Sequence, residues 1–269
     1  MITPRAKISS RGEAMNKFLS DLRGAAPILL AAAVVALVFV PVPIVGIEIL
    51  LAANLLLAAA IFAGGIATAG KRPRWLPQAV FYFCFVALGI AVATTRCFLT
   101  ARDFEAQIPL ARVIGQWICR ENVVVGFMST LGVSAAIIVC CKEGSNRIAE
   151  VAARFCLDTM GQKTFVIDSE LNKGKITQQE ADSKRKSLRR EADFYSGLDG
   201  SAKYLEGTIK AFVWIFAAAC LGGVAVGVLE MDLFWKEAAR QSAILSCGYL
   251  ALQIPPLLFA SAAVAVASE

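Results

Sequence analysis

The sequence contains no histidine and few charged residues. Only 18% of the 269 residues are Asp, Glu, Lys or Arg, whereas 57% are hydrophobic. The absence of histidine excludes histidine-ligated metal sites, histidine general bases and Ser-His-Asp triads. The low charge and the mean hydropathy of +0.63 are not those of a soluble domain and indicate a membrane protein.

The chain also lacks the cysteine and active-site patterns of other protein classes. No Cys-X-X-Cys pair occurs, so neither a disulfide framework nor a zinc site is predicted. Most cysteines lie in apolar runs, where cysteine acts as a small hydrophobic residue. No nucleophile–base pair, phosphate-binding loop or metal-ligand cluster is present, and we expect no enzyme activity, no cofactor and no metal. The N-terminus shows no pattern of a removable signal peptide.

Long apolar runs are what the sequence has in abundance. About twenty residues cross a bilayer as a helix, and about six runs approach or exceed that length. They cover 25–40, 47–69, 77–98, 123–141, 209–229 and 243–266. We predict an all-α polytopic membrane protein of about six transmembrane helices, with a small helical insert between the fourth and the fifth. The predicted parts are a basic N-terminal segment 1–24, a membrane module 25–141, the insert 142–208 and a second membrane module 209–269.

Glycine and proline residues occur within and between these apolar runs. Pro41 and Pro43 predict a tight turn between the first two spans, and Gly222, Gly223 and Gly227 predict close helix packing in the fifth. The segment Gln253-Ile254-Pro255-Pro256 predicts a break near the middle of the sixth span.

Lysine and arginine predict the orientation. They are concentrated in the N-terminal segment, at 71–74 and in the insert, and about six alternating spans put all three on the same side. By the positive-inside rule, this side is cytoplasmic, and both termini lie there with the insert. The net charge of +6 is therefore attributed to orientation in a bacterial inner membrane and not to nucleic acid binding.

The insert has local signals of helices. Residues 172–174, Asn-Lys-Gly, predict a turn. Thr177 and Glu180 form a capping-box pattern that starts a helix, which we expect to end by 198–200. A short extended piece is expected at 164–167.

Four charged residues of the insert fall on one helical face. Arg147, Glu150, Arg154 and Asp158 are spaced by three, four and four residues. The pairs Glu150–Arg154 and Arg154–Asp158 would each contribute about 0.2–0.5 kcal/mol. The pattern fits either an ordinary solvated surface helix or a functional charged face.

The insert and its flanks resemble a known family. Its signature is similar to R-I-A-E-V-A-A-R-F-C-L-D at 147–158, to Ile167-Asp168 and to E-A-D-F-Y-S-G-L-D-G-S-A-K at 191–203. Further likenesses follow in the same order along nearly the whole chain, at VPVP, KRP, VATTR, GQ–ENVVVG and QIP. These residues resemble the FHIPEP family, the large export-gate proteins of bacterial flagellar and virulence type III secretion systems.

The resemblance implies a function, partners and functional residues. Family members form nonameric rings that are thought to couple proton-motive force to protein export, helped by a separate ATPase. The implied partners are other copies in a homo-oligomeric ring, other membrane proteins of the export apparatus, secreted proteins and the lipid bilayer, with no nucleic acid. The candidate functional residues are the charges of the insert: Arg147, Glu150, Arg154, Asp158, Lys163, Asp168, Asp193, Asp199 and Lys203.

The sequence departs from the family pattern inside the membrane. Residues 207–209 are Gly-Thr-Ile where the family has Gly-Asp-Ala, and Ala87 and Ala91 stand for an Arg and an Asn. An acid shortly before QIP is also absent. Ionisable residues inside membranes are costly and usually functional, so these losses suggest weakened or abandoned proton coupling. Alternatively, coupling has moved to Glu206, to Lys210 or to a partner protein.

Two other functions stay open at this stage. An independent secondary transporter or channel would need polar residues near the membrane midplane, and Asn54 and Gln253 are the candidates. A scaffold remnant that assembles without transporting would fit the missing acids. The family continues through two more spans into a large cytoplasmic domain, whereas this sequence stops at Ser268-Glu269; a truncated piece, a split gene and a degenerate copy are the alternatives.

Overall fold

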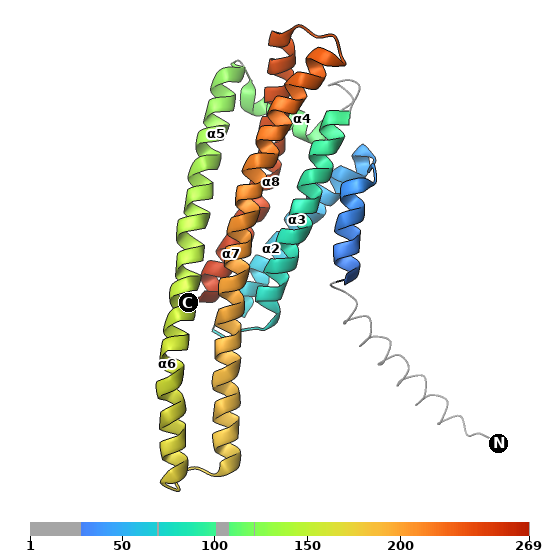
Figure 1. The fold of residues 1–269 in the computed structure, drawn as a ribbon. Coiled ribbons are helices and arrows are strands. Elements are labelled where there is room, and N and C mark those ends of the chain that lie inside the picture. Colours follow the sequence, from blue (N-terminus) through green and yellow to red (C-terminus); the bar gives the residue numbers. More distant parts are fainter. Residues whose placement is uncertain (1–27, 69, 101–107, 121, 269) are drawn as a thin grey trace, which may run out of the picture.

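The structure is a computed structural model that describes residues 28–68, 70–100, 108–120 and 122–268, apart from the side chain of Lys142. Within these ranges the chain folds into helices and contains no strand (Figure 1). The predicted basic segment 1–24 lies outside the described residues.

The predicted membrane helices are present. Five helices are long and apolar enough to cross a membrane, and a shorter apolar helix, Ile28–Phe39, lies in the first predicted span. After Ile28–Phe39, the elements are α2 (Ile44–Ala67), α3 (Trp75–Thr100), α4 (Pro109–Cys119), α5 (Val123–Cys140), the π-helical segment η2 (Cys141–Asn146), α6 (Arg147–Asn172), α7 (Gln178–Leu229) and α8 (Trp235–Ser268). The all-α membrane fold is therefore confirmed.

The insert is a helical hairpin that continues two membrane helices without interruption. The segments α5, η2 and α6 follow one another directly, and α7 runs for 52 residues. The turn at 172–174 is confirmed, with Gly174 at a φ of +69°. The capping box is confirmed too: the Thr177 amide donates to Glu180 over 2.8 Å, and the Glu180 amide donates to the Thr177 hydroxyl over 3.3 Å.

Two local predictions for the insert were wrong. The extended piece at 164–167 is helical, because Ile167 is buried against Ala181 and Leu188 of the facing helix. The helix end at 198–200 is also absent, since Leu198 is fully buried in the main hydrophobic core. Burial of one apolar side chain outweighs the modest helix penalty of a single glycine, roughly 1 kcal/mol.

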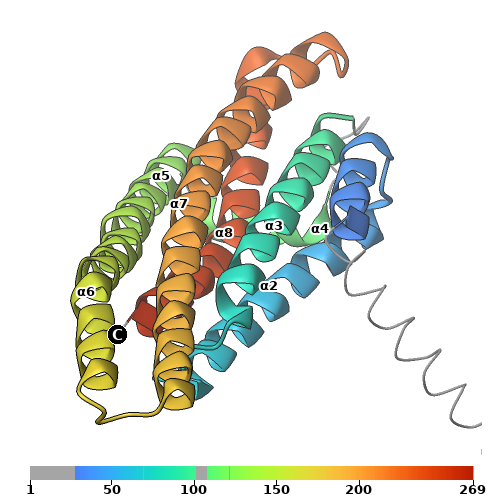
Figure 2. The same ribbon diagram turned by 60° about the horizontal axis from the view of Figure 1, so that its bottom comes forward.

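Helix α8 is the centre of the bundle. It packs against α2, α4, α5 and α7, and in Figure 2 it lies between α5 on one side and α2 on the other. The predicted break in this helix was wrong: Pro255 and Pro256 lie inside α8, and the helix continues past them. Neighbouring helices can re-satisfy the backbone groups that proline frees, and Pro256 is buried among them.

Glycines allow the closest helix contacts. A Cβ atom on Gly248 of α8 would lie 1.7 Å from the Ala111 carbonyl oxygen of α4, and one on Gly115 would lie 2.0 Å from the Ile244 carbonyl oxygen. The predicted close packing of the fifth span is confirmed at Gly223, where a Cβ would lie 2.5 Å from the Ser242 hydroxyl oxygen. The backbones of α4 and α8 therefore touch, and no larger side chain fits between them.

Gly248→Ala should separate α4 from α8 and lower the thermal unfolding midpoint of the detergent-solubilised protein. The expected loss is about 1–3 kcal/mol, the usual range for overpacking a core. Gly132→Ala is the matched control, because a Cβ there meets no atom within 4 Å, and alanine is the better helix former. Equal midpoints for the two variants would contradict the close contact.

Candidate functional site

The candidate site is the hairpin of α6 and the first part of α7. Figure 1 shows the hairpin extending past the ends of α2 and α3 at the bottom of the view. A small apolar cluster, separate from the main core, holds its two helices together. Its buried members are Ile167, Ala181 and Leu188, and Met160, Leu171 and Ile176 pack around them.

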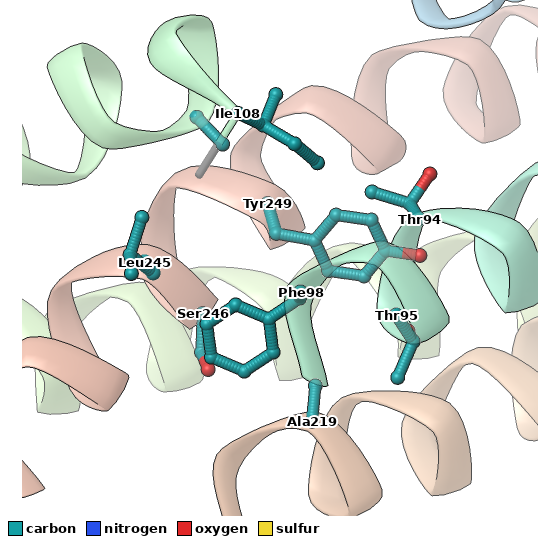
Figure 3. Close-up of a pocket in the computed structure, with 9 residues that line it drawn as sticks. Thr94, Thr95, Phe98, Ile108, Ala219, Leu245, Ser246 and Tyr249 are labelled. Atoms are coloured by element: carbon teal, nitrogen blue, oxygen red, sulfur yellow. The ribbon is translucent and has the colours of Figure 1, made fainter. Parts of the chain in front are cut away.

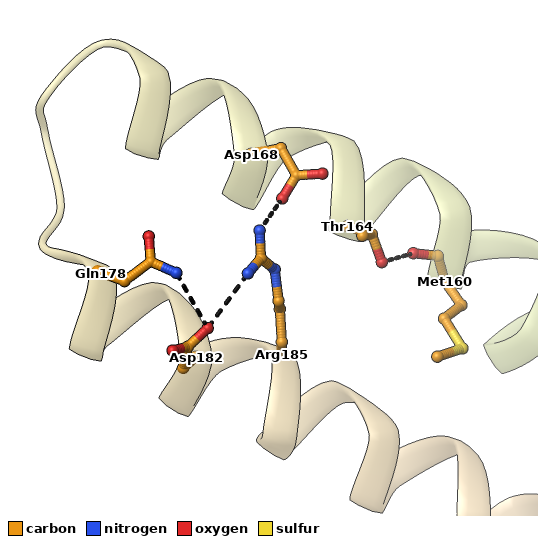
Figure 4. A network of polar contacts seen from close by, with 6 residues as sticks. All are labelled: Met160, Thr164, Asp168, Gln178, Asp182 and Arg185. Carbon is orange, nitrogen blue, oxygen red and sulfur yellow. Dashed lines mark hydrogen bonds and ion pairs between the residues drawn. The ribbon is translucent and has the colours of Figure 1, made fainter.

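Ion pairs cross between the two helices near the turn. The Arg185 guanidinium contacts Asp168 at 2.6 Å and Asp182 at 3.2 Å, as Figure 4 shows. Lys184 contacts Glu170 at 2.6 Å. The hydrogen bond from Lys184 lowers the pKa of Glu170, and the hydrogen bond to Asp168 raises the pKa of Arg185. Asp168, a predicted site residue, thus joins α6 to α7.

A second set of contacts joins the hairpin to the loop between α2 and α3. Glu191 of α7 contacts Arg72 of this loop at 3.1 Å and Lys163 of α6 at 3.6 Å. The Arg72 guanidinium also lies 5.3 Å from the centre of the Tyr195 ring. Lys163 was a predicted site residue, whereas Arg72 and Glu191 were not singled out, although both belong to segments that carry the family likeness.

The charged face of α6 differs from its prediction. Glu150, Arg154 and Asp158 are exposed, and among the described residues no ion pair joins Glu150 to Arg154 or Arg154 to Asp158. Arg147 contacts Glu143 at 3.8 Å instead. The predicted pairs are worth only a few tenths of a kcal/mol, which is too little to fix exposed side chains against hydration. The hydrogen bond to Asp199 raises the pKa of Lys203 of α7, and the nearby charge of Glu150 raises it further. Arg154 and Asp158, in contrast, make no ion pair with any described residue.

The remaining predicted site residues lie along α7. Asp199 accepts a hydrogen bond from Lys203 over 2.9 Å, and its other carboxylate oxygen is buried without a hydrogen-bond partner. Asp193 is exposed and lines a cleft with basic residues of α7. The structure places these residues but does not test the roles predicted for them.

The junction of α5 and α6 is fixed by polar contacts to two other helices. Ser145 of η2 accepts a hydrogen bond from Ser261 of α8 over 2.9 Å. Asn146 donates to Glu206 of α7 over 2.6 Å, and Glu206 contacts Lys210 at 2.8 Å. π-Helical turns are rare and are frequent at functional sites. Glu206 is thus a largely buried acid beside the predicted membrane boundary.

The positions that depart from the family pattern gather in one apolar seam. Ala87 and Ala91 of α3 and Thr208 of α7 are all buried. The Tyr249 hydroxyl of α8 donates to the Ala91 carbonyl over 2.9 Å and lies 3.5 Å from the Gln253 amide nitrogen. Tyr249 was not among the residues predicted from the sequence. Its position inside an apolar run could have indicated a buried hydroxyl group that needs a hydrogen-bond partner.

A cavity of about 20 Å³ adjoins this seam, with Tyr249 in its wall beside Thr94 and Thr95 (Figure 3). Such a cavity has room for about one water molecule. Neither Asn54 nor Gln253, the polar residues named for the independent transporter hypothesis, lines this cavity. Within the described residues, no cluster of three Cys, Asp or Glu side chains could hold a metal ion.

Comparison with known proteins gives a consistent result. Residues 34–269 match the FHIPEP family. The chain is 32% identical over 263 residues to a putative flagellar export/assembly protein LfhA of Escherichia coli O44:H18, covering 94% of this chain and 37% of that protein. It is 33% identical over 187 residues to the flagellar biosynthesis protein FlhA of Bacillus subtilis, covering 69% and 27%.

A relative named for secretion and not for the flagellum is about as similar. The chain is 31% identical over 232 residues to the hypersensitivity response secretion protein HrpI of Pseudomonas syringae pv. syringae, covering 84% of this chain and 32% of that protein. The chain thus spans about a third of the length of the curated relatives it matches. No solved structure matches it.

Arg185→Gln should loosen the hairpin, because it removes the contacts with both Asp168 and Asp182. We expect several-fold faster amide hydrogen exchange in residues 160–188 and unchanged exchange in α2 and α3. Arg154→Gln is the control, since Arg154 makes no ion pair with a described residue. Equal exchange in the two variants would show that the ion pairs do not hold the hairpin.

Proposed function

The chain belongs to the FHIPEP family, and on that premise we propose that it is the membrane part of a type III protein export gate, flagellar or virulence-associated. The observation that carries the proposal is the family match, which covers the helical bundle and the hairpin together. The chain would act as a transport component and not as an enzyme. Its partners would be other membrane proteins of the export apparatus and the secreted proteins.

The proposed location is the bacterial inner membrane, with the hairpin in the cytoplasm. The basic loop at 70–74 and the hairpin lie at the same end of the bundle, where Arg72 contacts Glu191 (Figure 1). This arrangement supports the orientation that the lysines and arginines predict.

The outer face of α6 supports assembly with further copies of the chain. Ile148, Val151 and Phe155 are exposed by 45%, 50% and 67% and are spaced by three and four residues, so they form one stripe. The charged stripe of Glu150, Arg154 and Asp158 runs beside it. An apolar strip beside exposed charges is the composition of a protein interface with a polar rim. We assign this surface to a neighbouring copy, whose charges would pair with those of α6.

Proton coupling is a separate part of the proposal. Ala87, Ala91 and Thr208 stand in the α3–α7–α8 seam where the family pattern has an Arg, an Asn and an Asp. Glu206 is the acid nearest to this region that contacts both the π-helical junction and Lys210. Coupling that is weakened, or that is carried by Glu206 or by a partner, fits this arrangement.

Arg154→Ala should impair secretion while leaving membrane insertion and folding intact. The arginine makes no ion pair with any residue that the structure describes, so its removal should cost the monomer little, but an interface would lose a charge. Export into the medium is compared with that of Lys173→Ala, an exposed basic residue at the hairpin turn. Normal secretion by the Arg154 variant would reject the role of this face.

Phe155→Asp should reduce the mass of the detergent-solubilised complex, because it places a charge in the proposed apolar strip. Phe155→Leu keeps the apolar surface and should preserve the large assembly. A single mass for wild type and both variants, whether monomeric or oligomeric, would place the interface elsewhere.

A further inference from the structure

A basic cleft lies where α7 passes the loop between α2 and α3. It has a volume of about 620 Å³. Five cationic side chains line it, against two acidic ones: Arg74, Arg185, Lys186, Arg189 and Arg190 face Asp182 and Asp193. A second hollow, formed by the loop residues 70–72 with Arg74, Ser187, Arg190 and Glu191, adjoins it. Basic residues far apart in sequence are thus gathered around one concave surface.

Most of these cations have no partner within the described chain. Arg185 is the exception, since it contacts Asp168 and Asp182. Arg74, Lys186, Arg189 and Arg190 are exposed and make no ion pair with any described residue. The nearby Arg72, Lys163 and Lys184, in contrast, are each paired with a glutamate. The cleft therefore carries a surplus of positive charge that is fixed in place by a rigid helix.

The cleft lies beside the start of α3, a helix that is long and apolar enough to cross a membrane. Arg74 directly precedes α3, and the Trp75 ring at the start of α3 covers Gly64 near the end of α2, where a Cβ would lie 2.6 Å from the ring. Interfacial tryptophans mark the headgroup region. Gly197 of α7 abuts Pro77 of α3, which fixes the height of α7. Arg74 of the cleft wall therefore lies next to the end of a helix that is long and apolar enough to cross a membrane.

We propose that this cleft binds the phosphate headgroup of an anionic phospholipid. Guanidinium groups form bidentate hydrogen bonds with phosphate oxygens, and basic pockets beside membrane helices bind anionic headgroups. The apolar side chains of Leu188 and Met160 in the cleft wall can contact the glycerol region. A phospholipid is favoured over an acidic protein because Arg74 directly precedes a candidate membrane helix, so the bilayer itself would supply the ligand beside the cleft. The positive-inside rule explains why basic residues lie near a membrane. It does not explain why Arg74 of the loop and the basic residues of α7 line the same cleft.

The test compares lipid retention by the full chain. The protein is purified in detergent with phosphatidylglycerol or phosphatidylcholine, and bound lipid is measured by native mass spectrometry. Arg189→Gln/Arg190→Gln should weaken phosphatidylglycerol binding about thirty-fold, since each basic residue near the surface contributes about 1 kcal/mol. Lys173→Gln/Lys175→Gln removes the same charge at the hairpin turn and should bind like the wild type. Arg189→Lys/Arg190→Lys keeps the charge and should restore part of the affinity.

Several results would overturn the proposal. Equal phosphatidylglycerol retention by the cleft and turn variants would show a general charge effect, and equal retention of phosphatidylcholine would show that the phosphate charge is not recognised. A cleft variant that keeps its lipid but loses binding of soluble poly-glutamate would make the cleft a docking site for an acidic protein. Should the double variant unfold, Arg74→Gln, which changes the exposed loop alone, decides the same question. None of these outcomes depends on export activity.

Discussion

Small side chains along α8 determine how closely the other helices can approach the centre of the bundle. Helices in a bilayer gain nothing from excluding lipid tails, so they associate through close packing and polar contacts. Gly248 lets the backbone of α4 touch α8, and Ala263 packs beside Gly65 of α2. The contact between Ser261 and Ser145 adds a polar link to the junction of α5 and α6. The helix that makes these contacts therefore positions α2, α4, α5 and α7, and through α5 and α7 the hairpin.

Two sets of connections position the hairpin: the membrane helices that lead into it and the loop between α2 and α3. The helices of the bundle continue directly into the hairpin, through α5 and η2 into α6 and along α7, so packing in the bundle sets the distance between its two arms. In addition, the ion pair between Arg72 and Glu191 joins the hairpin to the α2–α3 loop. The outer face of α6 stays exposed, with Phe155 beside Arg154. The charges between α6 and α7 are paired, whereas this outer face is exposed. Such an arrangement is consistent with a chain that buries this face against a neighbouring copy.

The sequence predicted the membrane helices, the hairpin turn and the capping box because each depends on local pattern. A long apolar run in lipid must form a helix because its backbone groups have no water to bind, and this holds whatever packs against it. Thr177 and Glu180 contact each other within one helical turn. The wrong predictions concern positions where distant contacts decide. Gly200 and the prolines of α8 are helix breakers by local preference, but burial of Leu198 and of Pro256 keeps both helices intact. Likewise, no local pattern could bring Tyr249 to the Ala91 carbonyl.

The length of α7 has a structural consequence. Its 52 residues form a rod of about 78 Å that crosses from the hairpin turn to the far side of the bundle. Because α7 is one continuous helix, the hairpin turn is joined without a break to Gly223, which packs against Ser242 of α8. The other arm meets the bundle through the π-helical segment at 141–146. The two arms of the hairpin are therefore joined to the membrane helices in different ways, one by an unbroken α-helix and the other through a π-helical turn.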